Sequence, residues 1–228
     1  MSAAGGSPSL RERYASTGAP SGDTAWRSAR YCAVDLELTG LDPRRHEIVS
    51  FGAVPIEDGR VQLGAALSGP VRPRGPVDEA TIRVHGLRAA DLLEAPRAEE
   101  ALEPLLGLLA GAVAVAHFAE VERAFLRRAL KQMDVRMRTP LVDTAVLGAL
   151  WLSERDHVPP RRLPLAELAR ALGLPSHRPH EALGDALTTA QVFLALATHL
   201  DAVRPQTVSS LVKAERTLQT VRLYPPAG

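Results

Sequence analysis

Two carboxylates follow a short apolar run near the start of the chain and could hold a metal ion. Asp35 and Glu37 come at the end of the run that begins at Tyr31, and residues two apart on a β-strand project from the same face. Their mutual repulsion is costly in a partly buried place unless a cation lies between them. Such oxygen ligands suit Mg²⁺ or Mn²⁺ better than Zn²⁺. Taken alone, the pattern is more simply interpreted as an exposed strand end with solvated charges.

A histidine and an aspartate stand together about 145 residues later. Asp185 falls in the first turns of a strongly apolar helical pattern, and His180 precedes it. On one helix their offset would separate them by about 140°, so we place His180 on the loop before the helix. A histidine beside metal-held carboxylates could act as a general base for water. The alternative is a surface histidine with an aspartate favoured by the helix dipole, and from these residues alone the two interpretations are about even.

A third candidate is Glu122, at the start of an amphipathic helical pattern that follows another apolar run. Its side chain could lean toward the strand ends and join the other carboxylates. It could equally pair at the surface with Arg123 or Arg127. From this segment alone the surface pairing is favoured.

The sequence pattern predicts that the elements that position these groups form one layered α/β domain. Apolar runs bounded by turn residues predict strands at Tyr31–Leu36, Glu47–Pro55, Arg60–Leu67 and Ala112–Ala116. Helical periodicity and end signals predict helices at Ala98–Leu109, Ala119–Lys131, Asp143–Leu152, Leu165–Leu172 and Glu181–Leu200. Strands first, followed by alternating helices and strands, indicate a mixed sheet covered by helices.

The two ends of the chain read as additions to this domain. Residues 1–28 are rich in Gly, Ser, Ala and Pro and predict a flexible tail. The domain itself is expected to span residues 29–203. Residues 204–228 are set off by Pro205 and predict an extension with one short helix at most.

Length and composition limit the class of protein. The 228 residues suit one domain, and the single Cys32 excludes a disulfide framework and a multi-cysteine zinc site. A net charge of +1 gives no bulk attraction to nucleic acid. The apolar stretch Leu105–Phe118 is shorter than the roughly 20 residues that span a bilayer, and no secretory signal is evident. We therefore expect a soluble cytoplasmic protein without a membrane partner.

In this order and spacing the motifs resemble the DEDDh 3′–5′ exonucleases, the family of the proofreading epsilon subunit of the bacterial replicative polymerase, RNase T and oligoribonuclease. The family's first motif, Asp-x-Glu-x-Thr-Gly-Leu, is matched by Asp35, Glu37, Thr39, Gly40 and Leu41. The third motif, His-x-Ala-x-x-Asp-Ala, is matched by His180, Ala182, Asp185 and Ala186. Connecting segments that resemble those of the family include His85-Gly86-Leu87 and Val142-Asp143-Thr144. The resemblance runs from about Tyr31 to Leu200.

The middle motif departs from the family pattern His-Asn-Ala-x-Phe-Asp-x-x-Phe-Leu. His117 and Phe125 fix the register, which makes Glu122 the counterpart of the usual aspartate. Glutamate keeps the charge but carries it one carbon–carbon bond farther, about 1.5 Å. Glu122 could serve with a modest adjustment, or it could weaken or alter the activity. Phe118 replaces the usual asparagine and could offer a stacking face to a base.

The resemblance implies a ribonuclease-H-like three-layer fold with a mixed five-stranded sheet flanked by helices. It also implies two Mg²⁺ or Mn²⁺ ions, held by Asp35, Glu37 and Asp185 and supported through water by Glu122. Two metal ions about 3.5–4 Å apart stabilise the attacking and leaving oxygens of an in-line displacement at phosphorus. His180 would take the proton of the attacking water, and nucleoside 5′-monophosphates would leave from the 3′ end.

The implied substrate is nucleic acid with a free 3′ end, and single-stranded DNA is favoured. Leu38, Thr39, His117 and Phe118 are the expected contacts to the substrate. RNA ends or short oligoribonucleotides are the alternative, because sugar selectivity depends on how a pocket treats the 2′-hydroxyl. A non-catalytic module that binds nucleic acid or serves as a scaffold is the alternative from another class. The sequence allows a polymerase or repair partner and leaves the oligomeric state open.

Overall fold

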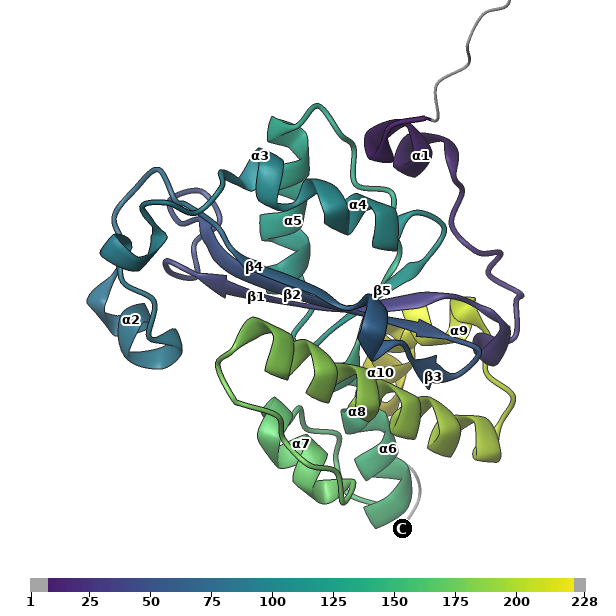
Figure 1. Cartoon of the computed structure of the whole chain (residues 1–228). Coiled ribbons are helices and arrows are strands. Elements are labelled where there is room, and N and C mark those ends of the chain that lie inside the picture. Colours follow the sequence, from purple (N-terminus) through teal and green to yellow (C-terminus); the bar gives the residue numbers. More distant parts are fainter. Residues whose placement is uncertain (1–7, 224–228) are drawn as a thin grey trace, which may run out of the picture.

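A mixed β-sheet forms the middle layer of the computed structural model, which describes residues 8–223 and side chains up to residue 219 (Figure 1). Its strands are β1 (Tyr31–Leu38), β2 (Ile48–Glu57), β3 (Arg60–Val61), β4 (Leu67–Pro70), β5 (Val113–Ala116) and β6 (Leu141–Asp143). They lie in the order β3-β2-β1-β5-β6, and β4 also pairs with β2. The β1–β2 pair is antiparallel, whereas β5 runs parallel to β1 and β6 parallel to β5.

Helices cover both faces of this sheet (Figure 1). They are α1 (Leu10–Ser16), α2 (Glu79–His85), α3 (Ala98–Ala101), α4 (Glu103–Leu109), α5 (Glu120–Gln132), α6 (Thr144–Asp156), α7 (Leu165–Ala171), α8 (Ala182–Val203), α9 (Val208–Val212) and α10 (Ala214–Leu223). One buried cluster joins the sheet to α1, α4 and α5, and the other joins it to α6–α10. The predicted three-layer α/β class is therefore confirmed.

The alternation of side chains along β1 determines on which face of the sheet its carboxylates lie. Val34 and Leu36 belong to the cluster under α4 and α5, while Tyr31 and Ala33 belong to the cluster under α8. Because strand residues alternate between faces, Asp35 continues the face that α8 covers. The strand thus carries its first carboxylate out of an apolar core toward the start of α8.

The sheet has six strands in place of the five that we expected. Arg60–Leu67 is not one strand, because β3 ends at Val61 and a turn of 3-10 helix at Leu63–Ala65 precedes β4. The additional strand at the parallel edge is Leu141–Asp143. Its three residues are too few to show the alternation or the length by which a strand is recognised in a sequence.

The segment before β1 is not the flexible tail that its composition predicts. Within the described part, α1 packs on α4, with Tyr14 buried and its hydroxyl 2.9 Å from the Thr139 hydroxyl. Trp26 is also buried and lies edge-on to Phe193 of α8. Residues 1–7 lie outside the described residues. Two large aromatic side chains therefore tie this segment to the core.

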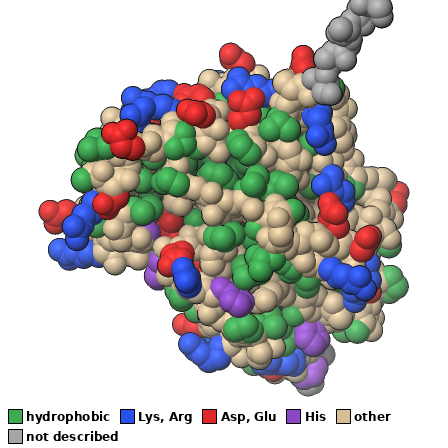
Figure 2. Space-filling view, viewed as in Figure 1, with side chains coloured by type: hydrophobic (Ala, Val, Ile, Leu, Met, Phe, Trp, Pro, Cys, Tyr) green, Lys and Arg blue, Asp and Glu red, His purple; other side chains and the backbone are tan. Residues whose placement is uncertain are grey.

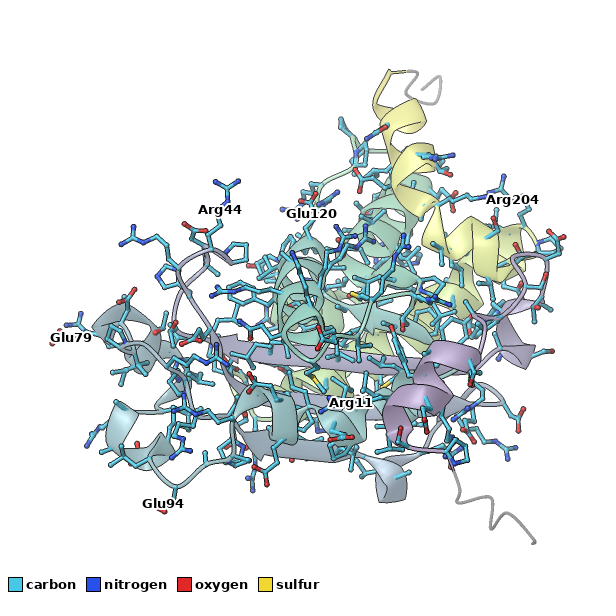
Figure 3. All side chains as sticks on the ribbon, turned by 90° about the horizontal axis from the view of Figure 1, so that it is seen from above. Arg11, Arg44, Glu79, Glu94, Glu120 and Arg204 are labelled. Atoms are coloured by element: carbon cyan, nitrogen blue, oxygen red, sulfur yellow. The ribbon has the colours of Figure 1, made fainter. Side chains whose placement is uncertain are left out.

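The segment after α8 also packs on the domain, and it holds two helices where at most one was expected. Thr207 forms an isolated antiparallel bridge with Ala25, which joins the two ends of the domain. Figure 3 shows the C-terminal helices (yellow) beside the N-terminal segment (purple) at the right of the view. Leu211 and Leu218 are buried, and α10 packs on α6. The last residues, 224–228, lie outside the described part.

By length and composition α8 could cross a membrane. It packs against β1 and β2, and half of its apolar stretch is buried within the domain. Its apolar character follows from its place in the core.

Candidate active site

Three carboxylates meet at the end of β1. Asp35 and Glu37 of β1 and Asp185 of α8 each offer an oxygen atom, and these three oxygens lie within 4.8 Å of one another. In Figure 1 the end of β1, α2 and the start of α8 converge at the left of the molecule. Figure 2 shows a notch in the outline there, with acidic and histidine side chains beside it. The structure therefore brings together the two outer motifs identified in the sequence.

Glycine at two positions allows the start of α8 to pack closely against β2 and against the loop that precedes α8. Gly52 of β2 faces the backbone of α8, and a Cβ atom there would lie 2.2 Å from the Ala182 carbonyl oxygen. At Gly184, within α8, a Cβ atom would lie 2.3 Å from the His177 carbonyl oxygen. Any side chain at either position would force the first turn of α8 or its preceding loop outward. Asp185 would move with that turn.

The three carboxylates resist ionisation in the absence of a cation. Burial raises the pKa of Asp35 well above its ordinary value, and repulsion by Glu122, Asp185 and Glu37 raises it further. Burial and then Asp185 raise the pKa of Glu37 to about 7, and burial also raises the pKa of Asp185. A divalent cation would compensate this repulsion. The donor set of three clustered carboxylates fits Mg²⁺ or Mn²⁺.

Glu122 faces the same site from α5. Its side chain is buried, and its Oε2 atom has no hydrogen-bond partner within the described residues. Burial, then repulsion by Asp143 and Glu37, raises the pKa of Glu122 to about 8. The surface pairing with an arginine, favoured from the segment alone, is therefore wrong. A buried carboxylate oxygen without a partner suits a site that gains a cation or ordered water.

His180 lies beside Asp185 on an exposed loop. Its backbone N–H donates a hydrogen bond of 2.8 Å to Oδ2 of Asp185, and its φ of 66° is unusual for a residue other than glycine. The side chain itself is exposed. His177, three residues earlier, lies against α8, with its Nε2 atom 3.0 Å from Oε1 of Gln191. His180 is thus the histidine whose ring is free to turn toward the carboxylates.

His117 is buried and supports the site from within the core. Its Nδ1 lies 2.9 Å from the Thr144 hydroxyl and its Nε2 lies 2.9 Å from the Leu163 carbonyl oxygen. Burial lowers its pKa to about 4, so the ring is neutral at pH 7. Both ring nitrogens are engaged within the protein. The predicted substrate contact of His117 would therefore need a rearrangement.

Phe118, the next residue, is exposed beside the site. Its backbone has a φ of 55°, and its N–H donates a hydrogen bond of 3.2 Å to Oδ1 of Asp143. The ring lies edge-on to His117, with 4.6 Å between ring centroids. This turn leaves the Phe118 side chain partly exposed to solvent.

The residues just after the first two carboxylates are fixed by the start of β2. Thr39 is buried and accepts a hydrogen bond of 2.9 Å from the Glu47 N–H, while its own N–H donates to the Glu47 carbonyl oxygen. Leu38 is buried as well. The loop of residues 39–47, which these bonds close, is therefore anchored at both ends.

Two further residues at the site received no role from the sequence. Asp143 accepts hydrogen bonds from the backbone N–H groups of Phe118, Ala119 and Ala145, and so joins the turn after β5 to the start of α6. Its position before a helix is the signal of an N-cap. His85 ends α2, where burial and the nearby His180 lower its pKa. Both residues belong to connecting segments that resemble those of the family.

Comparison with known proteins identifies relatives over the part of the chain that carries the four carboxylates. Residues 32–193 match the RNase T family model, described as exonuclease. The PolC-type DNA polymerase III of Thermotoga petrophila is 31% identical over 205 residues, which cover 89% of this chain and 14% of the relative. The DNA polymerase III epsilon subunit of Aquifex aeolicus is 28% identical over 171 residues, covering 75% of this chain and 81% of the relative.

A solved structure has the same fold. The nuclease domain of 3′hExo, described as a DEDDh family member bound to rAMP, aligns with a TM-score of 0.61 and 17% identity. The alignment covers 81% of this chain and 98% of that domain. The layered α/β fold is thus shared, and the family model extends from β1 into α8. This chain belongs to the RNase T family of exonucleases.

Proposed function

We propose that this chain is a metal-dependent 3′–5′ exonuclease that removes nucleoside 5′-monophosphates from single-stranded DNA. The observation that carries the proposal is the meeting of the Asp35, Glu37 and Asp185 oxygens within 4.8 Å, with Glu122 buried beside them. Membership of the exonuclease family supports it. The curated polymerase III relatives favour DNA and a polymerase partner, although the chain spans only about one seventh of the PolC-type relative.

The four carboxylates would have different roles at the metal site. Asp35, Glu37 and Asp185 would hold one ion, Asp35 would also contact a second, and Glu122 would support the pair through water. Two divalent cations at such a site stabilise the attacking and leaving oxygens of an in-line displacement at phosphorus. Burial raises the pKa of all three carboxyls, and neighbouring carboxylates raise the pKa of Asp35 and of Glu37 further. Cations would compensate this cost of ionisation.

His180 would take a proton from the attacking water on a ring nitrogen. The water oxygen forms a bond to the terminal phosphorus as the bond from phosphorus to the 3′-oxygen breaks, and that oxygen gains a proton from solvent. The hydrogen bond from the His180 N–H to Asp185 keeps the loop at the site while the exposed ring remains able to turn. The general-base role is inferred from this placement and from the ability of a neutral imidazole nitrogen to accept a proton.

The terminal nucleotide would lie against Leu38 and Thr39 and stack on Phe118. Thr39 is fixed by its two hydrogen bonds to Glu47, so it would offer a rigid edge to the sugar. The exposed ring of Phe118 could stack on any base, which is consistent with removal of nucleotides irrespective of sequence. His117 would act by holding this turn in place.

A second candidate substrate is RNA, which is favoured by the rAMP bound to the related nuclease domain. One experiment compares matched single-stranded DNA and RNA oligonucleotides, each labelled at the 5′ end, with Mn²⁺ and with EDTA. A metal-dependent ladder that shortens from the 3′ end supports an exonuclease, and the faster of the two ladders identifies the preferred sugar. No shortening of either strand would leave a non-catalytic binding module. Immediate release of the labelled 5′ nucleotide would contradict the proposed direction.

A further inference from the structure

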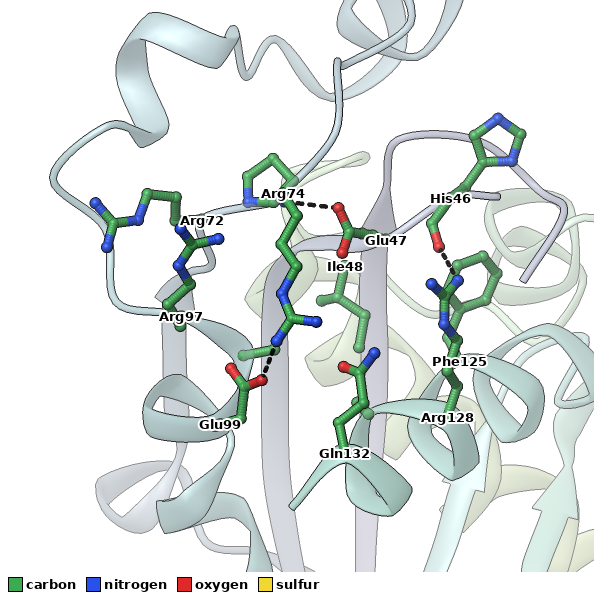
Figure 4. Close-up of a pocket in the computed structure, with 13 residues that line it drawn as sticks. His46, Glu47, Ile48, Arg72, Arg74, Arg97, Glu99, Phe125, Arg128 and Gln132 are labelled. Atoms are coloured by element: carbon green, nitrogen blue, oxygen red, sulfur yellow. Dashed lines mark hydrogen bonds and ion pairs between the residues drawn. The ribbon is translucent and has the colours of Figure 1, made fainter. Parts of the chain in front are cut away.

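A pocket lined by four arginines lies beneath the loop of residues 39–47 (Figure 4). We call it the arginine pocket and define it by Arg72, Arg74, Arg97 and Arg128, with Glu47 and Glu99 as its two carboxylates. Figure 4 shows Arg97 and Arg74 on one side and Arg128 on the other, with Phe125 beside Arg128 and Gln132 of α5 lower down between the two sides. The pocket is separate from the four carboxylates of the metal site.

The charges that line the arginine pocket do not balance. Four arginines and two glutamates line it, which leaves a formal charge of about +2. Glu99 pairs with Arg74. Oε2 of Glu47 accepts hydrogen bonds from the backbone N–H groups of Arg74 at 2.6 Å and Gly75 at 2.9 Å. Both carboxylates are therefore already engaged.

The remaining arginines have no carboxylate partner within the described residues. Arg128 donates to the carbonyl oxygens of Pro43 and His46, and Arg72 donates to the Leu93 carbonyl oxygen. The Arg97 side chain makes no hydrogen bond or ion pair in the part of the chain that the structure describes. Because like charges held together in one pocket repel each other, this arrangement favours an anionic ligand.

The arginine pocket is connected to the site through α5 and through the loop above it. Arg128 follows Glu122 by six residues on α5, which corresponds to about 9 Å along the helix axis. Its guanidinium holds the same loop whose other end, Thr39, is expected to contact the terminal nucleotide. In a stacked strand the phosphates advance by about 3.4 Å per nucleotide. An axial offset of about 9 Å exceeds one such step, so a strand that leaves the site along α5 would reach Arg128 upstream of its terminal nucleotide.

We propose that the arginine pocket binds a backbone phosphate of the nucleic-acid strand, upstream of the terminal nucleotide. This inference rests on the proposed function and names a contact that would let the enzyme distinguish longer strands from very short ones. Arg97 supplies the free guanidinium, and Arg128 couples phosphate binding to the loop that carries Thr39. Contacts of this kind raise affinity without reading sequence.

The direct test replaces Arg97, because its side chain has no other partner within the described residues. With single-stranded DNA of eight nucleotides, Arg97→Gln should raise KM about three- to tenfold with kcat unchanged. With a dinucleotide it should change neither. For the longer strand, the slope of the logarithm of the binding constant against the logarithm of salt concentration should become shallower by about one, which corresponds to the loss of one phosphate contact. Arg97→Glu should have a larger effect. Arg204→Gln is the matched control, since Arg204 is exposed at the far end of the molecule (Figure 3).

Binding measurements separate this inference from the proposed function. Fluorescence anisotropy of labelled oligonucleotides of two and eight nucleotides, with Asp35→Asn as the parent protein, requires no turnover. An inactive wild type would contradict the proposed function, whereas a length-dependent loss of affinity in Arg97→Gln would still support the arginine pocket. If Arg97→Gln and Arg97→Glu bind both lengths as tightly as Arg204→Gln does, the proposal is overturned.

Calorimetric titration with inorganic phosphate tests whether the arginine pocket binds a backbone phosphate of the strand or a free phosphate. Competition by millimolar phosphate against the eight-nucleotide strand, lost in Arg97→Glu, supports a backbone phosphate in the arginine pocket. Binding of inorganic phosphate that Arg97→Glu abolishes, combined with equal oligonucleotide affinity in all variants, would overturn the backbone assignment. It would leave a site for free phosphate or released nucleotide.

Discussion

Gly52 pairs with Asp35 across the antiparallel ladder of β1 and β2, at the point where the first turn of α8 meets the sheet. A Cβ atom on Gly52 would lie 2.2 Å from the Ala182 carbonyl oxygen. The missing side chain therefore sets the distance between the strand that carries Asp35 and the helix that carries Asp185.

Gly52→Ala should accordingly damage the site more than it damages the fold. The added methyl group must push α8 outward, which costs about 1–3 kcal/mol of unfolding free energy. A displacement of about 1 Å at Asp185 could lower the rate about a hundredfold. Steady-state turnover and urea unfolding check the two effects. Gly64→Ala, whose added Cβ meets no atom within 4 Å, is the control, and equal turnover in the two variants would contradict this role for Gly52.

Glu122→Asp should keep or raise activity. The shorter side chain restores the carboxylate length usual in the family and keeps the charge, moving it by about 1.5 Å. Removing one buried methylene should cost roughly 1 kcal/mol of stability. Initial rates at saturating Mn²⁺ for the wild type and for the Glu122→Asp and Glu122→Gln variants give the comparison. Complete loss of activity in Glu122→Asp would mean that the site has been rebuilt around the longer carboxylate.

The metal-free protein should lose stability as pH rises from about 4.5 to about 8. The folded-state pKa values of Glu37, about 7, and Glu122, about 8, lie above the ordinary value of 4.5. Folding therefore favours the protonated carboxyls, and this contribution is fully present below about pH 4.5 and is lost as pH rises through the folded-state values. Thermal melts in EDTA at pH 5.5 and 8.5 measure the loss, and Glu122→Gln should reduce it.

Addition of Mn²⁺ should reverse this loss. A cation that binds only the folded protein raises the melting temperature with concentration, and the rise should be larger at pH 8.5 than at pH 5.5. A rise of equal size at both pH values, or one retained in Asp35→Asn, would be inconsistent with binding at the clustered carboxylates.

The C-terminal helices should contribute substantially to stability. Leu218 of α10 is completely buried, and Leu→Ala at such a position costs about 2–5 kcal/mol. Leu218→Ala should therefore lower the urea midpoint clearly, whereas Leu63→Ala should not, because Leu63 is 56% exposed. Equal midpoints for the two variants would show that α10 does not belong to the folding unit.

Much of the site could be predicted because its outer motifs lie on regular elements. The alternation of apolar residues along β1 places Asp35 and Glu37 on one face, and the long apolar pattern after Asp185 marks α8. Glu122 carried a usable signal as well. It precedes Phe125 and Leu126 by three and four residues, so it shares the buried face of α5.

Other elements lacked such a signal. The seven residues of α2 include no buried side chain, so no apolar periodicity marks this helix, and His85 at its end could not be placed. The helix expected over Ala98–Leu109 divides near Leu102 because Pro104 occupies the first turn of α4. The packing of Trp26 and Leu218 depends on contacts between the two ends of the chain, which neither end shows alone.

The most direct test of the metal site is the release of nucleoside 5′-monophosphate from single-stranded DNA labelled at its 3′ end. With Mn²⁺ the wild type should release labelled monophosphate from the start of the reaction, and EDTA should stop it. Asp35→Asn should lower the rate by about a hundredfold or more while keeping its fold by circular dichroism. Release that is independent of metal, or equally fast in Asp35→Asn, would contradict the assignment of catalysis to the carboxylates at the end of β1.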